Sequence, residues 1–293
     1  MTRVNAKTAR IKTKTGKLNI TVPDLTFLTS ADSRRIEAAE EYGALRSAQA
    51  VKAAQPDSAA AWEEFGGGHL VFVAKDHPVG RAHALGFSGK VTAEDIEHVE
   101  EFYFRHGAAA QVDVSPYADP SLFQTLNQRS FQVAEFNQTL ARRISPEERF
   151  TAKMEGMEIR PVLPEETGTW RKVLAQVFFG EHAAQWEDLF TPWAENNPMA
   201  LAAFSGGKMV AGAGGLLVPQ YKLAAFFGAA TLPEAQGRGV QSAFMLARLN
   251  VAQQAGCDLA VTLTMPGTTS QRNAERAGFR TAYTKVVVSK APQ

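Results

Sequence analysis

The chain has 293 residues, a formal net charge of +1 at pH 7, 45% hydrophobic residues and one cysteine. This length suffices for two domains with buried cores, and the nearly neutral charge excludes the strong positive field with which proteins attract nucleic acid. A single cysteine, Cys257, excludes an internal disulfide framework and argues against a thiolate metal site, so we expect no metal centre.

The first seventeen residues are basic and contain no acidic residue. We predict a solvated, disordered tail at 1–17; the alternative is an arm that binds nucleic acid. The N-terminus has no apolar signal core, and no apolar run approaches the roughly 18 residues of a membrane span. We therefore expect a cytoplasmic protein without a membrane or nucleic-acid partner.

The N-terminal half contains the signals of a mixed α/β domain. Residues 70–74 and 79–87 have strand character and predict a hairpin. Thr92 and Asp95 fit a capping box that starts a helix, and Gly107 ends it. A strand at 111–115, a short helix from Ser121 and a strand at 132–140 follow.

The C-terminal half repeats this order with one addition. We predict a strand at 158–163, helices at 170–179 and 184–193, and a hairpin of 201–205 with 209–218. A strand at 223–232, a helix from Val240 to Gly256, a strand at 259–264, a short helix at 270–277 and a last strand at 281–289 complete it. The helix prediction rests on apolar residues spaced three and four apart: Val240, Ala243, Phe244, Ala247 and Val251.

A Gly-rich turn joins the strand at 223–232 to that helix. Gly237 and Gly239 lie where side chains would block a ligand from the free N–H groups of the helix start, and Arg238 adds a positive charge. Such a turn attracts phosphate, and its size suits a pyrophosphate. The dinucleotide fingerprint needs a third glycine where this chain has Ser242, and a Walker loop needs a Gly-Lys-Ser/Thr ending, so both are excluded.

The remaining pattern, Gln236-Gly-Arg-Gly-Val-Gln241, resembles the acetyl-CoA pyrophosphate loop of the GNAT superfamily of N-acetyltransferases. The downstream order of strand, short helix, Gly278-Phe279 and strand also looks like the second half of a GNAT fold. In the N-terminal half, Gly107 and Phe131 have nearly the same spacing as Gly256 and Phe279. We therefore predict two tandem GNAT-like domains of the α/β (α+β) class, each with a mixed, strongly twisted central sheet flanked by helices.

The two predicted domains differ in their loops. The N-terminal half is shorter between hairpin and helix end, and its helix opens with Glu94 and Asp95, which repel a pyrophosphate. We therefore expect a degenerate domain without a phosphate loop at 18–150 and an acetyl-CoA-binding domain at 157–293. The chain should hold one cofactor site.

The resemblance implies acetyl-CoA as cofactor. It places strand-end residues against the pantetheine arm, the loop and helix start around the pyrophosphate, and the short helix on the cofactor's other side. The residues so assigned are Ala230, Thr231, Leu232, Gln236, Gly237, Arg238, Gly239, Val240, Gln241, Ser242, Ser270, Asn273 and Arg276. Arg276 fits a solvated helix face equally well.

Catalysis is less clearly marked. An unperturbed lysine amine, with a pKa near ~10.4, is almost entirely charged at pH 7, whereas an α-amino group with a pKa near ~7.7–8.0 is neutral about one time in ten. The strand at 223–232 contains no carboxylate or histidine, so His182 and Glu181 are the candidate bases. The acceptor is a small-molecule or peptide amine, and it attacks directly in a ternary complex.

Three residues depart from the superfamily pattern. Gln241 replaces a Gly or Ala, so its side chain must turn away from the pyrophosphate or bind it. Ala274 replaces a tyrosine that commonly protonates the departing thiolate, and Gly267 replaces an asparagine that contacts the cofactor. These departures leave open an alternative function, a non-catalytic CoA-binding sensor or interaction module.

Overall fold

Two strands, β7 (Gln132–Arg143) and β13 (Arg280–Lys290), are each divided between two units of the structure. The computed structural model describes residues 7–13, 16–22, 28–151, 154–194 and 197–292. Unit 1 consists of Met1–Phe27 and Leu140–Thr281, and unit 2 consists of Leu28–Thr139 and Ala282–Gln293. The two units do not divide at the predicted boundary of 150–157, because the two halves of the chain exchange the ends of these strands.

Side-chain packing explains the exchange. The last strand contains three consecutive valines, and Val286 and Val288 pack into the core of unit 2 while β13 pairs antiparallel with β6 (Ala110–Val114). Conversely, Leu140 and Ile144 pack into the core of unit 1. Alternation predicts the two faces of a strand but does not name its neighbours, so the sequence could not show this exchange.

Unit 1 contains strands in the order β7-β12-β11-β10-β9-β8. Its strands are β8 (Glu158–Pro161), β9 (Leu201–Ser205), β10 (Lys208–Val218), β11 (Leu223–Thr231) and β12 (Leu259–Thr264). Strands β8 to β11 pair antiparallel, whereas β11 and β12 are parallel. The ends of these strands lie within three residues of the ends predicted from the sequence.

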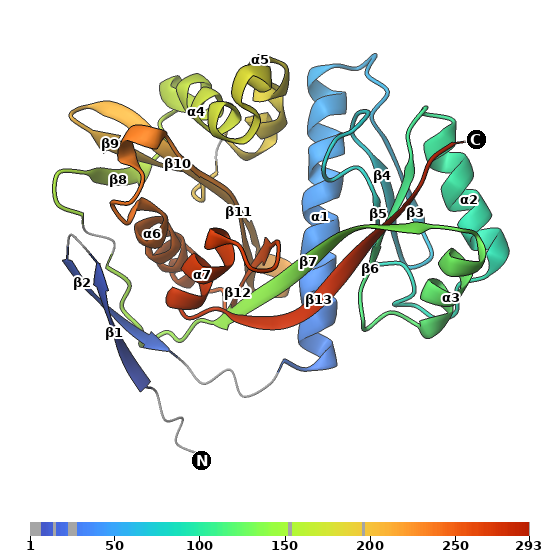
Figure 1. Ribbon diagram of the computed structural model, residues 1–293, viewed down its shortest axis with the longest axis horizontal. Coiled ribbons are helices and arrows are strands. Elements are labelled where there is room, and N and C mark those ends of the chain that lie inside the picture. The colour runs from blue at the N-terminus through green and yellow to red at the C-terminus, as the bar shows by residue number, and fades with distance from the viewer. Residues whose placement is uncertain (1–6, 14–15, 23–27, 152–153, 195–196, 293) are drawn as a thin grey trace. The chain divides into compact units, whose positions relative to one another are not determined.

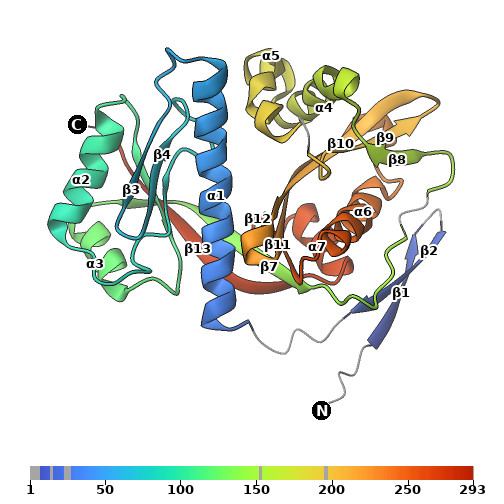
Figure 2. The same cartoon turned by 180° about the vertical axis from the view of Figure 1, so that it is seen from behind.

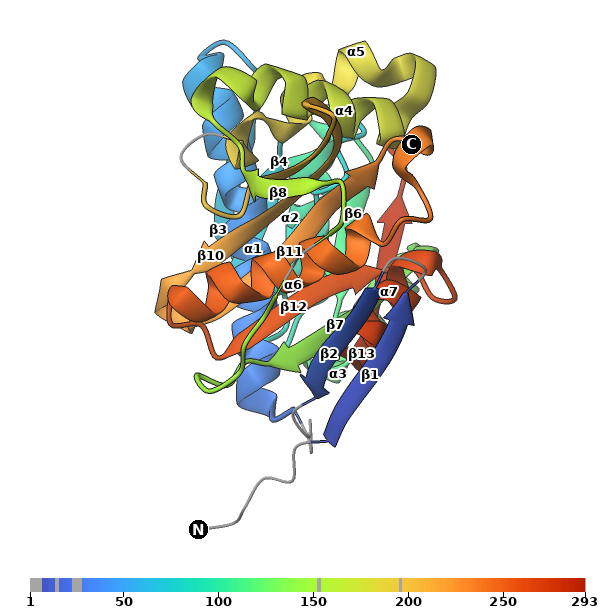
Figure 3. The ribbon, with the colours of Figure 1, turned by 90° about the vertical axis from the view of Figure 1, so that its left-hand side faces the viewer.

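Helices cover both faces of this sheet (Figures 1 and 3). Alternation along β9 explains why: Ala202 and Phe204 pack with Trp170 of α4 (Thr167–Phe179), whereas Leu201 and Ala203 pack with Phe244 of α6 (Val240–Gln254). Helix α7 (Thr269–Arg276) lies beside α6. The predicted apolar stripe of α6 was incomplete, because Met245, Leu246 and Leu249 are also buried.

The segment after α4 differs from the predicted helix at 184–193. Helix α5 (Ala183–Trp186) is a single turn and is followed by a 3-10 helix at Glu187–Trp193. Pro192 lies inside that 3-10 helix, and proline has no N–H to continue an α-helix. The chain therefore turns more tightly here than the apolar spacing indicates.

Unit 2 contains strands in the order β3-β4-β5-β6-β13-β7. Its remaining elements are α1 (Ser30–Ala54), β3 (Ala61–Phe65), β4 (Gly68–Phe72), β5 (Ala82–His83), α2 (Ala93–Phe104) and α3 (Pro120–Gln128). Val71 and Val73 face α1, whereas Leu70 and Phe72 face the side that carries α2 and α3 (Figure 2). The predicted hairpin of 70–74 with 79–87 is present in shortened form, because β4 pairs antiparallel with β5 and β5 has only two residues. The sequence did not reveal β3 or its tight turn to β4 at Gly66-Gly67.

The basic N-terminal segment contains secondary structure. Strands β1 (Lys7–Thr13) and β2 (Gly16–Val22) form an antiparallel hairpin. The prediction of a disordered tail at 1–17 is wrong for Lys7–Thr13 and for the first two residues of β2, because β-branched residues such as Thr8, Ile11 and Thr13 favour a strand despite the charge. Residues 1–6 and 14–15 lie outside the described residues.

Gly278 shows why the Gly-Phe turn needs its glycine. Its φ is +89°, and a Cβ at this position would lie 2.8 Å from Nε of Arg142. Arg142 is fully buried and donates to Glu148 Oε1 at 2.6 Å, so it has little freedom to move. The turn therefore excludes a side chain both by conformation and by space.

We predict that Gly278→Ala lowers the free energy of unfolding by about 2–4 kcal/mol, because positive φ and a steric clash act together. Gly207→Ala is the matched control: its φ is +78°, but nothing lies within 4 Å of the added Cβ. It should cost about 1 kcal/mol. Urea denaturation measures both, and equal losses would contradict the packing explanation.

A buried cluster of charges holds β13 in unit 2. The ammonium group of Lys285 lies 3.2 Å from Glu37 Oε2 and 3.4 Å from Asp113 Oδ2, and it also contacts Glu40. Burial raises the pKa of Glu40 to about 7, although the charge of Lys285 opposes this shift. Burial also acts on Asp113, but there the charges of Lys285 and Arg81 prevail and hold its pKa well below the ordinary value.

The raised pKa of Glu40 predicts a pH-dependent stability. Between pH 4.5 and 7 the folded protein binds a proton at Glu40 that the unfolded chain has lost, so this carboxyl group makes stability fall as pH rises. When the pH is raised from 5 to 8, the free energy of unfolding of Glu40→Gln should increase by about 1–3 kcal/mol relative to that of wild type, as measured by urea denaturation. Exposed Glu101→Gln is the control and should show no such gain. If the free energies of unfolding of Glu40→Gln and wild type differ by the same amount at pH 5 and pH 8, this explanation is contradicted.

Candidate phosphate-loop site

The end of β11 leads into a loop whose glycines are needed for conformation. Gly237 and Gly239 have φ values of +73° and +89°, and an added Cβ would meet nothing within 4 Å at either position. Both glycines therefore permit a left-handed backbone beside open space. Gly239 is the N-cap of α6 and provides no side-chain cap.

The first N–H groups of α6 consequently lack acceptors. The bond from Ala243 N to Gly239 O, at 3.1 Å, is the first across the helix start. Within the described part of the chain, no hydrogen bond is found for the N–H groups of Val240, Gln241 and Ser242. Together with the helix dipole these groups suit an anion, and the half-buried Arg238 adds positive charge.

Side chains of the loop fasten it to the end of the strand. Gln236 Nε2 donates to Thr231 O at 3.1 Å, and Gln241 Nε2 donates to Thr231 Oγ1 at 2.8 Å. Gln241, the first departure from the superfamily pattern, thus turns towards the strand. Leu232 N donates to Val210 O at 2.9 Å, so this N–H is already engaged.

Strand β11 separates from β12 just before this loop. The parallel register runs from Leu223↔Leu259 to Phe226↔Thr262, and Thr262 Oγ1 donates to Phe226 O at 3.0 Å. From residue 227 to 231 the described part of β12 provides no partner. This stretch, which includes Ala230 and Thr231, therefore presents an open strand edge to an extended ligand.

A β-bulge lies in the same stretch. Gly212 pairs with Ala230 and Gly214 pairs with Phe227, so two residues of β11, Gly228 and Ala229, face one residue of β10. Gly228 has a φ of +55°, as the first residue of a glycine bulge requires. A bulge of this kind re-aims backbone groups, and the sequence reasoning did not identify it.

Arg248 binds the backbone where the bulge begins. Its Nη1 donates to Gly214 O at 2.8 Å and to Phe227 O at 3.3 Å, and the guanidinium lies 4.7 Å from the ring centre of Phe226. The residue is 1% exposed, and burial lowers its pKa to about 9, so it stays charged at neutral pH. The sequence does carry a signal for it: a cation on the apolar face of a helix.

The three predicted residues of α7 lie at or near the protein surface. Ser270 and Arg276 are exposed, and Arg276 Nη1 donates to Asn273 Oδ1 at 3.0 Å. Among the described residues, no hydrogen bond or ion pair joins these three to residues 236–242. Ala274 is fully buried in the core with Phe279, so a larger side chain there would require repacking.

The candidate bases lie in an open part of unit 1. His182 Nε2 is 3.7 Å from Glu181 Oε1, and the side chains are 68% and 90% exposed. They belong to a 3-10 turn, Gly180–His182, that follows α4. Their assignment as bases stays a prediction.

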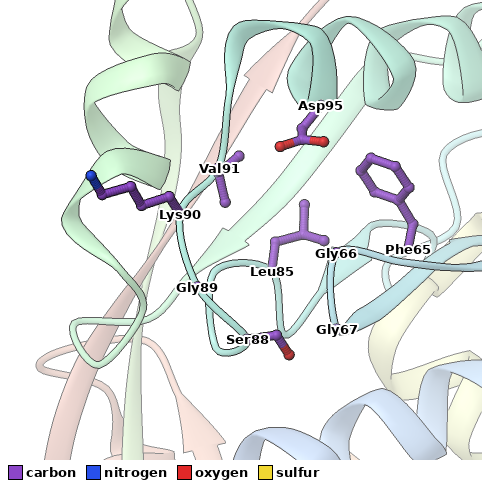
Figure 4. A pocket seen from close by; sticks show the side chains of 9 residues that line it. All are labelled: Phe65, Gly66, Gly67, Leu85, Ser88, Gly89, Lys90, Val91 and Asp95. Atoms are coloured by element: carbon purple, nitrogen blue, oxygen red, sulfur yellow. The ribbon is translucent and has the colours of Figure 1, made fainter.

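The corresponding place in unit 2 is built differently. Strand β5 pairs antiparallel with β4 and parallel with β6, as β11 does with β10 and β12, but it has two residues where β11 has nine. The start of α2 is closed by its own capping box: Asp95 N donates to Thr92 Oγ1 at 3.2 Å, and Thr92 N donates to Asp95 Oδ2 at 2.8 Å. Asp95 also lines a cavity of about 340 Å³ (Figure 4), where its carboxylate disfavours an anion.

Comparison with known proteins agrees with this geometry. Residues 168–279 match the profile of the acetyltransferase (GNAT) family. This part of the chain is a GNAT acetyltransferase domain. A comparison with curated proteins finds no significant relative.

Solved structures extend the likeness to both units. A GCN5-related N-acetyltransferase from Sphaerobacter thermophilus has a TM-score of 0.55 and 16% identity over 90% of this chain and 94% of its own. Another from Kribbella flavida has a TM-score of 0.58 and 15% identity over 84% and 96%. A tandem GNAT protein from the clavulanic acid biosynthesis pathway has a TM-score of 0.57 and 13% identity over 84% and 88%. The chain thus has the predicted tandem GNAT fold.

The GNAT fold supports acetyl transfer and generally binds acetyl-CoA. Among its described helices, none combines the length and apolar character needed to cross a membrane.

Proposed function

We propose that unit 1 transfers the acetyl group of acetyl-CoA to an amine by direct attack in a ternary complex. The observation that carries the proposal is the uncapped start of α6 behind Gly237 and Gly239, tied to the open end of β11. The free N–H groups there match a pyrophosphate, and the open edge at 227–231 matches an extended amide-containing arm such as pantetheine.

Each part of the site has a role in this proposal. The N–H groups of Val240, Gln241 and Ser242, with Arg238, hold the pyrophosphate. Ala230 and Thr231 offer backbone to the pantetheine arm; Leu232 contributes less, since its N–H is engaged by Val210. Ser270, Asn273 and Arg276 stay candidates for contacts on the cofactor's other side.

When bound, acetyl-CoA supplies a thioester: the amine nitrogen forms a bond to the acetyl carbon, the C–S bond breaks with its electron pair on sulfur, and the amine releases a proton. The protein's tasks are to orient the two reactants, to provide donors towards the acetyl oxygen and to accept that proton. A thiol with a pKa near ~8.5 leaves adequately without an acid, so the tyrosine replaced by Ala274 is dispensable.

Calorimetry with acetyl-CoA tests the site. Gly239→Glu should weaken binding at least about tenfold, because a side chain and a negative charge enter the anion site. Gly89→Glu is the matched control in unit 2: its φ is +138° and nothing lies within 4 Å of an added Cβ. It should leave affinity unchanged and the stoichiometry at one acetyl-CoA per chain. No binding by wild type, or unchanged affinity in Gly239→Glu, would refute the assignment.

Thiol release with a panel of amines tests the chemistry. At pH 7 we expect α-amino acceptors to react faster than lysine-type amines, because a larger fraction of them is neutral. His182→Gln should lower the rate at least about tenfold for a lysine-type amine and less than about threefold for an α-amine. Equal effects on both would remove His182 as the base. Acetyl-CoA binding without any acceptor-dependent release would instead support a CoA-binding sensor.

A further inference from the structure

Arg248 is a buried cation whose described surroundings contain no ion-pair partner. Besides Gly214 O and Phe227 O, its guanidinium reaches only Phe244 O at 3.3 Å and Met245 Sδ at 3.5 Å among the described atoms. Burying a charge is costly unless it is paired, and backbone carbonyls compensate it only in part. A leucine or methionine would fill the same helix position without this cost. The charge therefore requires a functional explanation.

The position of the charge supplies one. Arg248 is on the helix whose start forms the phosphate loop, and it binds the carbonyl groups of Gly214 on β10 and Phe227 on β11, the residue pair next to the bulge. Phe227 O belongs to the same peptide unit as the N–H of Gly228. A charge-assisted bond to that oxygen withdraws electron density from the peptide and makes the Gly228 N–H a stronger donor.

Acetyl transfer develops negative charge on the oxygen of the thioester. Donors that are fixed in advance in a water-poor site are the usual means of stabilising such an oxygen. The open edge at 227–231 directs an extended arm past the bulge, and the positive charge of Arg248 lies directly behind it. A lysine would supply charge as a single point that is free to rotate, whereas the planar guanidinium also donates from Nε to Phe244 O, which orients Nη1 towards both carbonyl groups.

We propose that Arg248 is a positioning residue that holds the bulge and polarises the Phe227–Gly228 peptide towards the acetyl oxygen. This inference rests on the proposed function, because it needs acetyl-CoA along β11. It differs from the role of the phosphate loop: Arg248 should affect the acetyl group and hardly affect the affinity for CoA.

Carbon-13 NMR of bound [1-¹³C]acetyl-CoA tests the inference without an acceptor. In wild type the carbonyl signal should move downfield on binding, and in Arg248→Met at least about half of that movement should be lost. Calorimetry should show affinities for CoA within about threefold of each other. The carbonyl shift in Arg248→Lys should fall between those of wild type and Arg248→Met, because lysine keeps the charge but loses the Nε bond that orients it. Arg272→Met, which removes an exposed guanidinium from α7, should behave as wild type.

The outcomes are separable. If wild type does not bind acetyl-CoA, the proposed function fails. If wild type binds and Arg248→Met leaves the carbonyl signal where wild type has it, only the role of Arg248 fails. If Arg248→Met lowers the affinity for CoA by more than about threefold, Arg248 has a structural role and the inference is overturned.

If Arg248→Met and Arg248→Lys both fail to fold, measurements on wild type test the inference. An unshifted carbonyl signal, or Arg248 side-chain N–H signals identical in the CoA and acetyl-CoA complexes, would overturn the inference. Distinct Arg248 signals together with a shifted carbonyl would support it. With an active amine, Arg248→Met should lower kcat at least about tenfold at nearly constant KM.

Discussion

Backbone hydrogen bonding organises unit 1. After Phe226, β11 has no partner on β12, and a few residues later α6 begins without a side-chain cap. Open backbone groups are costly inside a protein unless a ligand or water satisfies them. A strand edge and a helix start, opened within one stretch of chain, therefore form a single extended site. Glycines at 228, 237 and 239 make this possible, because each has a positive φ.

The two units have the same order of elements but differ in whether the backbone groups at the helix start have hydrogen-bond partners. In unit 2 the strand that corresponds to β11 is reduced to Ala82–His83, and the helix after it begins with a reciprocal capping box. A capped helix start already has acceptors for its N–H groups, and Asp95 adds a negative charge. The difference lies in a few side chains at one helix start and in the length of one strand. It leaves the helix start in unit 1 open, where we propose that the pyrophosphate binds.

Buried charges have different environments in the two units. Lys285 lies among three carboxylates, which compensate its charge and hold the end of the chain against α1 and β6. Arg248 has backbone carbonyls in place of carboxylates. A cation paired with carboxylates is a structural fastening, whereas a cation compensated by dipoles keeps a field that acts on its surroundings. This contrast is why Arg248, and not Lys285, points to chemistry.

Local features could be predicted from the sequence because their causes are local. Glycines at 237, 239 and 256, the capping box at Thr92, the turn at Gly206-Gly207 and the order of elements in the C-terminal half depend on backbone conformation and side-chain periodicity within a few residues. The glycine-rich loop and its resemblance to the GNAT family could be recognised for the same reason, because the motif consists of neighbouring residues.

Tertiary structure decided what depends on distant partners. The exchange of strand ends between the units, the separation of β11 from β12, the bulge at Gly228 and the carbonyl partners of Arg248 all require knowing which strand lies beside which. Periodicity reveals a strand's two faces but leaves its neighbours and register undefined. The sequence by itself thus determined that a glycine-rich loop joins a strand to a helix, and only the folded chain decided which backbone groups around it remain open.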